Sequence, residues 1–115
     1  MIKNRYIFIL AMLVAPACAS ALRGTATADE GIRFTYTAPA AASVAIAGEF
    51  NHWDPAKDRL RGPDEKGAWS ISLRLSEGRY EYRFVVNGKE WELDPSAPST
   101  DDGMGGRNSV VVVAP

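Results

Sequence analysis

Cysteine is nearly missing from this chain, since Cys18 is the only one among its 115 residues. Cys18 also lies in an N-terminal apolar segment that we expect to be separate from the folded part. A chain with no second cysteine cannot form an internal disulfide, and a folded part with no thiol has no cysteine nucleophile. The sequence therefore excludes disulfide-stapled scaffolds and thiol-dependent catalysis.

An excess of basic charge is missing as well. The chain has 13 lysines and arginines against 14 aspartates and glutamates, and Lys3 and Arg5 belong to the N-terminal segment. Without these two, 11 basic residues face 14 acidic ones, a formal charge of −3. Domains that bind nucleic acids usually carry basic stripes, so the balance argues against a nucleic-acid partner.

No apolar run is long enough to cross a membrane. The run from Tyr6 to Val14 has nine residues and Pro16 follows it, whereas a spanning helix needs about 20. Lys3 and Arg5 precede the run and small alanines follow it, which is the three-part pattern of a bacterial export signal. We therefore expect residues 1–21 to be a signal peptide and the protein to be exported.

Cys18 leaves two fates open for the exported chain. It follows the triplet "APA", which resembles the lipobox of bacterial lipoproteins, where the cysteine carries the lipid. Cleavage after Ala19 or Ala21 would instead remove the cysteine and release a periplasmic or secreted protein. Contact with the membrane is thus expected only through the signal or a lipid anchor. Residues 22–30, "LRGTATADE", are small and polar and predict a flexible tether.

From Gly31 onward apolar residues alternate with polar ones and never follow the helical spacing, which predicts an all-β domain over residues 31–115. Asn87-Gly88 is a strong hairpin signal. The last run, Val110 to Val113, is apolar enough for burial on both faces. Six or seven short antiparallel strands with closely spaced turns indicate an immunoglobulin-like β-sandwich. The expected strands cover residues 32–37, 43–47, 69–75, 79–86, 90–93 and 110–113.

The three tryptophans lie in different patterns. Trp69 shares a strand face with apolar residues, and its burial in the core would contribute about 2–3 kcal/mol. Trp53, in "FNHWDPAKD", lies in a turn with no periodic partners. It is either a plug at one end of the sandwich or a platform for a ligand with apolar faces and polar edges, such as a pyranose ring. Trp91 is intermediate, because it follows a hairpin turn between Glu90 and Glu92.

Catalytic and metal-binding patterns are not found. The carboxylates are scattered over loops and outward strand positions, whereas glycoside hydrolysis needs a carboxylate pair in a built site. His52 with Asp54 and Asp58 could be drawn as a metal site, but one histidine and two carboxylates in a turn are more often solvated polar residues. We expect neither an enzyme nor a bound metal or cofactor.

Three segments follow one another along the domain, "VAIAGEFNHWDP", "GRYEYRFVVNGKEWELDP" and "GGRNSVVVV". In order and spacing they resemble carbohydrate-binding module family 48. That family includes the glycogen-binding domain of the AMP-activated protein kinase β subunit and the early-set domains at the N-termini of isoamylases and branching enzymes. The resemblance runs from about Gly31 to Val113, and it implies an early-set sandwich with a site for α-glucans.

The resemblance also implies roles for single residues. Trp53 and Trp91 correspond to two tryptophans that stack on glucose rings, and Asn108 corresponds to an asparagine that hydrogen-bonds sugar. Met104 stands where the kinase domains have a leucine that reaches through a cyclic sugar. Gly106 stands where they have a hydroxyl-bearing residue, so that hydrogen bond is missing here.

Arg83 falls where the kinase domains carry a sugar-binding lysine. The strand alternation independently turns Arg83 away from the core face. An arginine offers fixed donors where a lysine offers one mobile ammonium group, so binding chemistry would be preserved with altered geometry. The alternative is a solvated cation paired with Glu81 or Glu92 across the hairpin, which contributes little.

Two functions from different classes remain open on the sequence. The first is a small exported module that binds glycogen, starch or maltodextrin without catalysis. The second is an envelope interaction domain that uses the early-set fold to contact a protein partner. An accessory role beside a separate amylolytic enzyme would combine the two.

Overall fold

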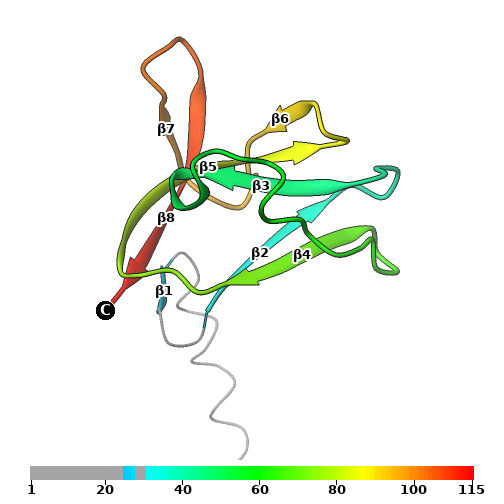
Figure 1. Cartoon of the computed structure of the whole chain (residues 1–115), viewed down its shortest axis with the longest axis horizontal. Coiled ribbons are helices and arrows are strands. Elements are labelled where there is room, and N and C mark those ends of the chain that lie inside the picture. Colours follow the sequence, from blue (N-terminus) through cyan, green and yellow to red (C-terminus); the bar gives the residue numbers. More distant parts are fainter. Residues whose placement is uncertain (1–24, 28–30) are drawn as a thin grey trace, which may run out of the picture.

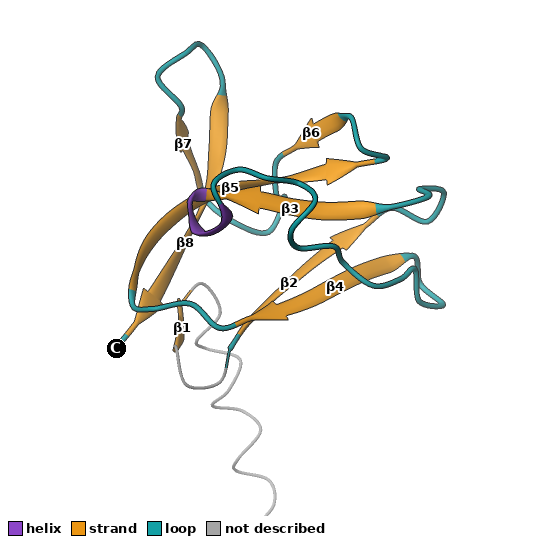
Figure 2. Ribbon diagram, viewed as in Figure 1, coloured by secondary structure: helices purple, strands orange, loops and turns teal. Residues whose placement is uncertain are grey.

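The computed structural model describes residues 25–27 and 31–115, and this part of the chain consists mainly of β-strands and the loops between them (Figure 2). The predicted signal peptide, Cys18 and the rest of the predicted tether lie outside the described residues. No helix within the described ranges is long and apolar enough to span a membrane. The elements are β1 (Thr25–Thr27), β2 (Ile32–Thr37), β3 (Val44–Gly48), the 3-10 turn η2 (Glu49–Asn51), β4 (Ala68–Leu73), β5 (Gly78–Val86), β6 (Glu90–Glu92), β7 (Ser99–Asp101) and β8 (Arg107–Ala114).

The strands form two sheets. In the larger sheet β1, β8, β5 and β3 are neighbours in that order, with β6 paired to β5 and β7 paired to β8 (Figure 1). β2 and β4 form the second sheet. Every strand pair is antiparallel except β1 with β8, which is parallel. This arrangement confirms the predicted all-β sandwich of early-set, immunoglobulin-like type.

The structure contains two strands that the sequence does not predict. β7 pairs with the start of β8, from Ser99 opposite Ser109 to Asp101 opposite Arg107. Its residues are short and polar, so backbone pairing defines this strand rather than an apolar face. β1 pairs with the end of β8, and at these three residues the chain differs from the flexible tether expected over 22–30.

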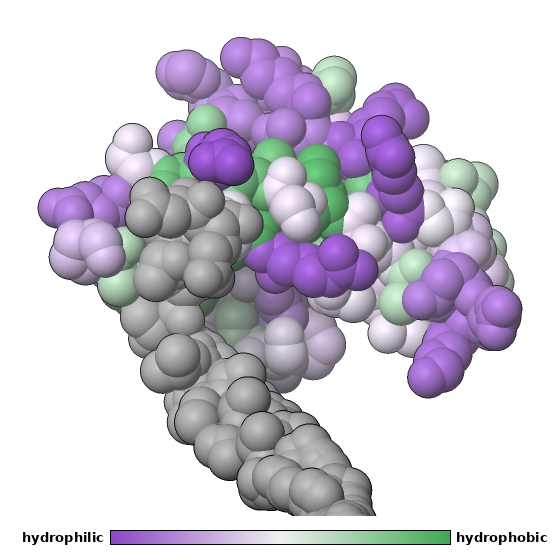
Figure 3. Space-filling model, turned by 90° about the horizontal axis from the view of Figure 1, so that it is seen from below, coloured by the Kyte–Doolittle hydropathy of each residue, from purple (hydrophilic) through white to green (hydrophobic). Residues whose placement is uncertain are grey.

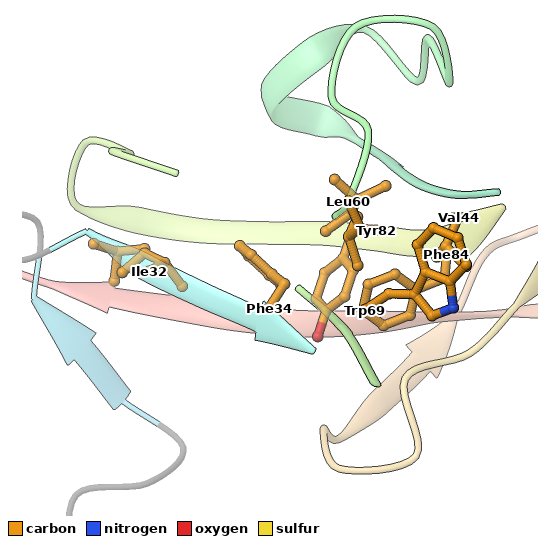
Figure 4. Close-up of a cluster of buried hydrophobic side chains, with 9 residues drawn as sticks. Ile32, Phe34, Val44, Leu60, Trp69, Tyr82 and Phe84 are labelled. Atoms are coloured by element: carbon orange, nitrogen blue, oxygen red, sulfur yellow. The ribbon is translucent and has the colours of Figure 1, made fainter. Parts of the chain in front are cut away.

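The alternation in the sequence places one face of each long strand in the core. Trp69 is 5% exposed and its Nε1 donates to the carbonyl oxygen of Ala38 at 2.9 Å, which confirms the prediction that it is a core residue. The rings of Phe34 and Tyr82 meet edge to face, with centroids 5.1 Å apart. Figure 4 shows the labelled core side chains between strands of the two sheets. The cluster consists of Ile32, Phe34, Val44, Ile46, Leu60, Trp69, Tyr82, Phe84 and Val113.

The prediction that β8 is buried on both faces is wrong. Val113 is buried in the core, but the neighbouring Val112 is 45% exposed. The reason is the layer arrangement, because β8 belongs to one of two sheets and only one face of each sheet packs against the other. A short apolar run does not reveal this difference by itself.

A buried carboxylate ties the segment after β6 to the core. Asp94 is 7% exposed, and its Oδ2 accepts a hydrogen bond from the Tyr82 hydroxyl at 2.6 Å. Its Oδ1 accepts from the backbone N and the Oγ of Ser96, and its own backbone N donates to Ser109 Oγ. Burial, together with the adjacent Asp94 carboxylate, raises the pKa of Tyr82. The network fixes the Asp94-Pro95 turn that follows Trp91.

Tyr82→Phe is expected to lower the free energy of unfolding by about 1.5–3 kcal/mol, because one buried oxygen of the Asp94 carboxylate loses its donor. Urea denaturation of the full chain measures the change. Tyr80→Phe is the matched control, since the Tyr80 hydroxyl donates to the carbonyl oxygen of Ser76 at an exposed position. Equal losses in the two variants would contradict the special role of the buried pair.

Candidate functional site

The outer face of β5, the face turned away from the core, carries every second residue of that strand. Directly opposite residues in antiparallel pairs share a face of the sheet. β3 lies on one side of β5, and both β6 and β8 lie on the other side. The opposing pairs on this outer face are Ala47 with Arg83, Ala45 with Val85, and Val85 with Trp91.

A tight turn after β3 brings Trp53 to the same face. β3 ends at Gly48, where an added Cβ would lie 2.6 Å from the backbone oxygen of Glu81, so glycine is needed for space. His52 and Trp53 both have left-handed backbone angles, with φ of 61° and 58°. This conformation is rare for bulky residues and is often found at functional positions. The backbone N of Trp53 closes the turn on the carbonyl oxygen of Gly48 at 2.9 Å.

Asn51 holds this turn from inside. Its side chain is buried, and its Oδ1 accepts from the backbone N of Gly48 at 2.9 Å. Its Nδ2 donates to the carbonyl oxygen of Ile46 at 3.0 Å and to Asp58 Oδ2 at 2.8 Å. Because these three bonds connect β3, the turn and the segment after it, they determine where Trp53 is placed.

Trp53 does not plug an end of the sandwich. It packs against Ala45, Ala47 and Val85, an apolar cluster on the outer face that is distinct from the main core. Because alanine side chains are small, the indole of Trp53 can lie close to the sheet at Ala45 and Ala47. The side chain remains partly exposed, so the tryptophan lies on the sheet surface and does not enter the core.

Trp91 lies on β6, which pairs with β5, whereas Trp53 packs on the alanines of β3, the strand on the other side of β5. The hairpin predicted from Asn87-Gly88 is present, with φ of 55° and 74° at these residues, the left-handed pair of a type I′ turn. β6 follows directly and sets Trp91 opposite Val85. Trp91 is 40% exposed, so much of this large side chain is open to solvent.

Arg83 lies on the same outer face, opposite Ala47, and is held by two partners. Its Nε donates to Asn108 Oδ1 at 2.9 Å, and its Nη2 forms an ion pair with Asp102 Oδ2 at 3.1 Å. The ion pair predicted as an alternative therefore exists, but with Asp102 in place of Glu81 or Glu92. The outward direction of Arg83 agrees with the strand alternation.

Asn108 connects Arg83 to a second carboxylate. It is 8% exposed, and its Nδ2 donates to Glu81 Oε1 at 3.1 Å. Hydrogen bonds from Asn108 and then from Arg79 lower the pKa of Glu81. With both polar atoms engaged, Asn108 positions the side chains around it in this structure. Its predicted direct bond to sugar stays a prediction.

The loop between β7 and β8 is organised by Asp102 and carries Met104. The Oδ1 of Asp102 accepts from the backbone N of Met104 at 2.7 Å and from that of Gly106 at 2.9 Å. These amides, followed by the Arg83 guanidinium, lower the pKa of Asp102. Met104 itself is 87% exposed. This hairpin projects from the body of the domain in Figure 1.

The structure gives a reason for a glycine at position 106 that the sequence does not reveal. An added Cβ would lie 2.7 Å from Asp102 Oδ2 and 3.3 Å from Arg83 Nη2. A larger residue would therefore displace the ion pair. Gly106 cannot offer a hydroxyl to a sugar, but it leaves room for the ion pair between Asp102 and Arg83, which orients the arginine.

Together these side chains surround one shallow hollow of about 400 Å³. The structure thus brings together all five side chains that the sequence singles out for sugar binding, and it adds three carboxylates to them. The lining residues are Glu49, Trp53, Glu81, Arg83, Trp91, Asp102, Met104 and Asn108.

The structure assigns other roles to the residues that could be drawn as a metal site. Asp58 accepts from Asn51, and Asp54 Oδ1 accepts from the backbone N of Ala56. Among the described residues, no group of three or more histidine, cysteine, aspartate or glutamate side chains is arranged to hold a metal ion.

Sequence patterns alone miss four residues of this site. Glu49, Glu81 and Asp102 stand at outward or loop positions that look like ordinary solvated carboxylates. Asn51 lies in the same short motif as Trp53, and an asparagine in a turn is the only signal that could have indicated it. Their roles depend on contacts between segments far apart in the chain.

Known proteins share this domain. A family model described as the glycogen recognition site of AMP-activated protein kinase matches residues 31–115. Protein PTST homolog 2, chloroplastic, of Arabidopsis thaliana is 32% identical over 74 residues, which are 64% of this chain and 13% of that protein. The 1,4-alpha-glucan branching enzymes GlgB of Francisella philomiragia subsp. philomiragia and Francisella tularensis subsp. novicida are each 37% identical over 74 residues, 59% of this chain and 12% of the enzyme. The chain thus spans about an eighth of the length of these curated relatives.

Proposed function

Because this chain belongs to the family of the glycogen recognition site of AMP-activated protein kinase, we propose that it binds α-1,4-linked glucans by stacking glucose rings on Trp53 and Trp91. The observation that carries the proposal is that both tryptophans line one hollow on the outer face of β5. A pyranose ring has apolar C–H faces that pack on an indole and a rim of hydroxyls that need polar partners. The hollow offers both kinds of surface.

The polar partners are the charged groups between the indoles. The Arg83 guanidinium has five N–H donors, of which the structure uses one on Asn108 and one on Asp102. The remaining donors are available to sugar hydroxyls, and the carboxylates of Glu81 and Asp102 accept from hydroxyls in return. Met104 adds an apolar contact at the rim, with the flexibility of an unbranched side chain.

The hollow is shallow, which limits the affinity. Two stacked rings each contribute about 1 kcal/mol beyond the burial of area. We expect dissociation constants roughly in the micromolar to millimolar range. The chain acts as a non-catalytic module in this proposal, and its ligand is glycogen, starch or a maltodextrin.

Export is the second part of the proposal. The N-terminal pattern of residues 1–21 supports a signal peptide, and Cys18 supports either a lipid anchor or removal with the signal. The protein would then act as a periplasmic, secreted or membrane-anchored glucan binder. Mass spectrometry of the mature N-terminus distinguishes a lipidated Cys18 from a cleaved one.

The export signal also favours a second function. An exported glucan binder needs glucan outside the cytoplasm, whereas an early-set domain in the envelope can instead contact a protein, for example a separate amylolytic enzyme. In that case the tryptophan face would bind the partner. Absence of glucan binding by the folded chain would favour this alternative.

Affinity electrophoresis tests the proposed function. The full chain is run through native gels that contain glycogen, amylopectin or no polysaccharide, with dextran as a control for a different glucosidic linkage. Retardation by glycogen and amylopectin but not by dextran supports an α-1,4-glucan site. Equal mobility in all four gels contradicts it.

We expect glucan binding to be constant between about pH 8 and pH 5 and to decline only below about pH 4. The pKa values of Asp102 and Glu81 are lowered from ordinary values of 3.8 and 4.5. Because their pKa values are lowered, both carboxylates are charged and contribute to glucan binding at any pH above these ordinary values. Their contribution is lost only as the pH falls through the lowered pKa values of the folded protein. Gel retardation across this range measures the profile. A decline that begins well above pH 5 would contradict this expectation.

A further inference from the structure

A second hollow lies on the other sheet and is lined by arginines. It measures about 380 Å³, and its guanidinium groups come from two separate parts of the chain: Arg33 from β2, Arg59 and Arg61 from the segment between η2 and β4. Two serine residues of β4, Ser70 and Ser72, complete its polar lining. This hollow shares no lining residue with the tryptophan hollow.

The backbone holds these arginines in fixed places. β2 and β4 pair so that Arg33 is opposite Ser72, and the Nη2 of Arg33 donates to Ser70 Oγ at 3.2 Å. Arg61 exchanges two backbone hydrogen bonds with Ser70, each 2.9 Å long. Arg59 forms an isolated bridge with Ala45 of β3. The three side chains therefore stand on paired backbone rather than on a free loop.

Carboxylates are missing from this lining. The two ion pairs between described residues are Arg79 with Glu81 and Arg83 with Asp102, and both lie on the larger sheet. Among the described side chains, none of the three arginines forms an ion pair. The three side chains are exposed to solvent, and without a carboxylate in the lining their like charges repel one another.

The cluster also has the chemistry of an anion site. Guanidinium forks match phosphate oxygens with two parallel hydrogen bonds, and serine hydroxyls add further donors. Figure 3 is seen from below, the side on which β2 and β4 lie in Figure 1, and hydrophilic side chains gather there around an apolar area. A concave lining suits a single phosphate group better than an extended polyanion.

We infer that Arg33, Arg59 and Arg61 form a binding site for a phosphate group, on the sheet opposite the glucan hollow. The phosphate belongs either to a free phosphate or to a phospholipid headgroup. The inference does not depend on glucan binding, because the two hollows share no lining residue.

Two measurements on the full chain test this site. Calorimetric titration with inorganic phosphate at low ionic strength measures the free ligand, and low salt is needed because salt screens exposed charges. Co-sedimentation with vesicles of phosphatidylglycerol and phosphatidylcholine, against vesicles of phosphatidylcholine alone, measures the lipid headgroup. All variants share the N-terminal segment, so its own affinity for vesicles cancels in the comparison.

The test variant is Arg33→Gln with Arg59→Gln and Arg61→Gln. The matched control is Lys57→Gln with Lys66→Gln and Lys89→Gln, which removes the same charge at exposed positions outside the hollow. We expect roughly tenfold weaker phosphate or vesicle binding in the arginine variant and unchanged binding in the lysine control.

The pattern of results identifies the source of the phosphate. Loss of titrated phosphate binding indicates a free ligand, and loss of vesicle binding alone indicates a lipid headgroup. Absence of both kinds of binding in the wild type, or equal weakening in the lysine control, overturns the inference. Glycogen retardation of the arginine variant should match the wild type, which keeps this test separate from that of the glucan site.

Discussion

Trp91→Ala should weaken glycogen binding by roughly tenfold while leaving the fold intact. The side chain is 40% exposed on a three-residue strand, so its removal costs the core nothing. In the proposed complex it covers one face of a glucose ring, and the loss of stacking and buried area amounts to about 1–3 kcal/mol. A difference of 1.4 kcal/mol is a factor of ten in affinity.

Affinity electrophoresis against a series of glycogen concentrations measures this change. Val112→Ala is the control, because Val112 is also an exposed large apolar residue but does not line the hollow. Trp91→Phe keeps an aromatic face and should retain part of the binding. If the alanine variant is retarded as strongly as the wild type, glucose does not stack on this residue.

Trp91 is a cleaner test than Trp53. Trp53 packs against Ala45, Ala47 and Val85 and adopts a left-handed backbone, so Trp53→Ala changes the turn as well as the ligand surface. Its thermal unfolding should therefore be measured beside its binding. A variant that binds less only because it unfolds would show both changes together.

Asn51→Ala should lower the free energy of unfolding by about 3–5 kcal/mol and weaken glucan binding at the same time. The substitution removes three hydrogen bonds, and it leaves the backbone N of Gly48 and the carbonyl oxygen of Ile46 without their buried partner. Each buried group left unsatisfied costs about 1–3 kcal/mol. Because Asn51 also determines the turn before Trp53, the indole should lose its fixed position on the sheet.

Urea denaturation measures the loss of stability, and gel retardation well below the unfolding midpoint measures binding. Asn51→Asp serves as a second variant, since it keeps the acceptor for Gly48 but places a carboxylate beside Asp58. It should be destabilised at neutral pH and recover in part on acidification, when the two carboxylates share a proton. A wild-type stability in either variant at pH 7 would contradict the role assigned to Asn51.

The local patterns in the sequence predict most of the strands and the direction of their side chains. Tyr82 and Phe84 face the core and Arg83 faces outward, because successive side chains of a strand point to opposite faces. The hairpin at Asn87-Gly88 follows from the backbone preferences of these two residues. The exposure of Val112 could not be predicted in this way, since an apolar run looks the same whether one face or both faces of its strand are packed.

The site residues also fall into two groups, those that the sequence indicates and those whose role only the tertiary contacts show. Trp53, Trp91, Arg83, Asn108 and Met104 stand out by pattern or by resemblance, and the structure places all five around one hollow. Asp102 carries no such signal, and the resemblance marks Gly106 only as a position without the hydroxyl. Their importance arises from a contact between the β7–β8 loop and β5, where Asp102 pairs with Arg83 and Gly106 leaves room for the pair.

By itself the sequence determined the fold class, the core face of each main strand and the membership of Trp53 and Trp91 in one family motif set. The fold class and the core faces follow from residues that are neighbours in the chain, where periodicity and turn chemistry act, whereas the motif set rests on the family resemblance. Only the tertiary structure decided that Trp53 rests on Ala45 and Ala47, across β5 from the strand that carries Trp91, and that three arginines line one hollow. Strand pairing between distant segments determines both, because register across a sheet is set by the packing of the whole domain.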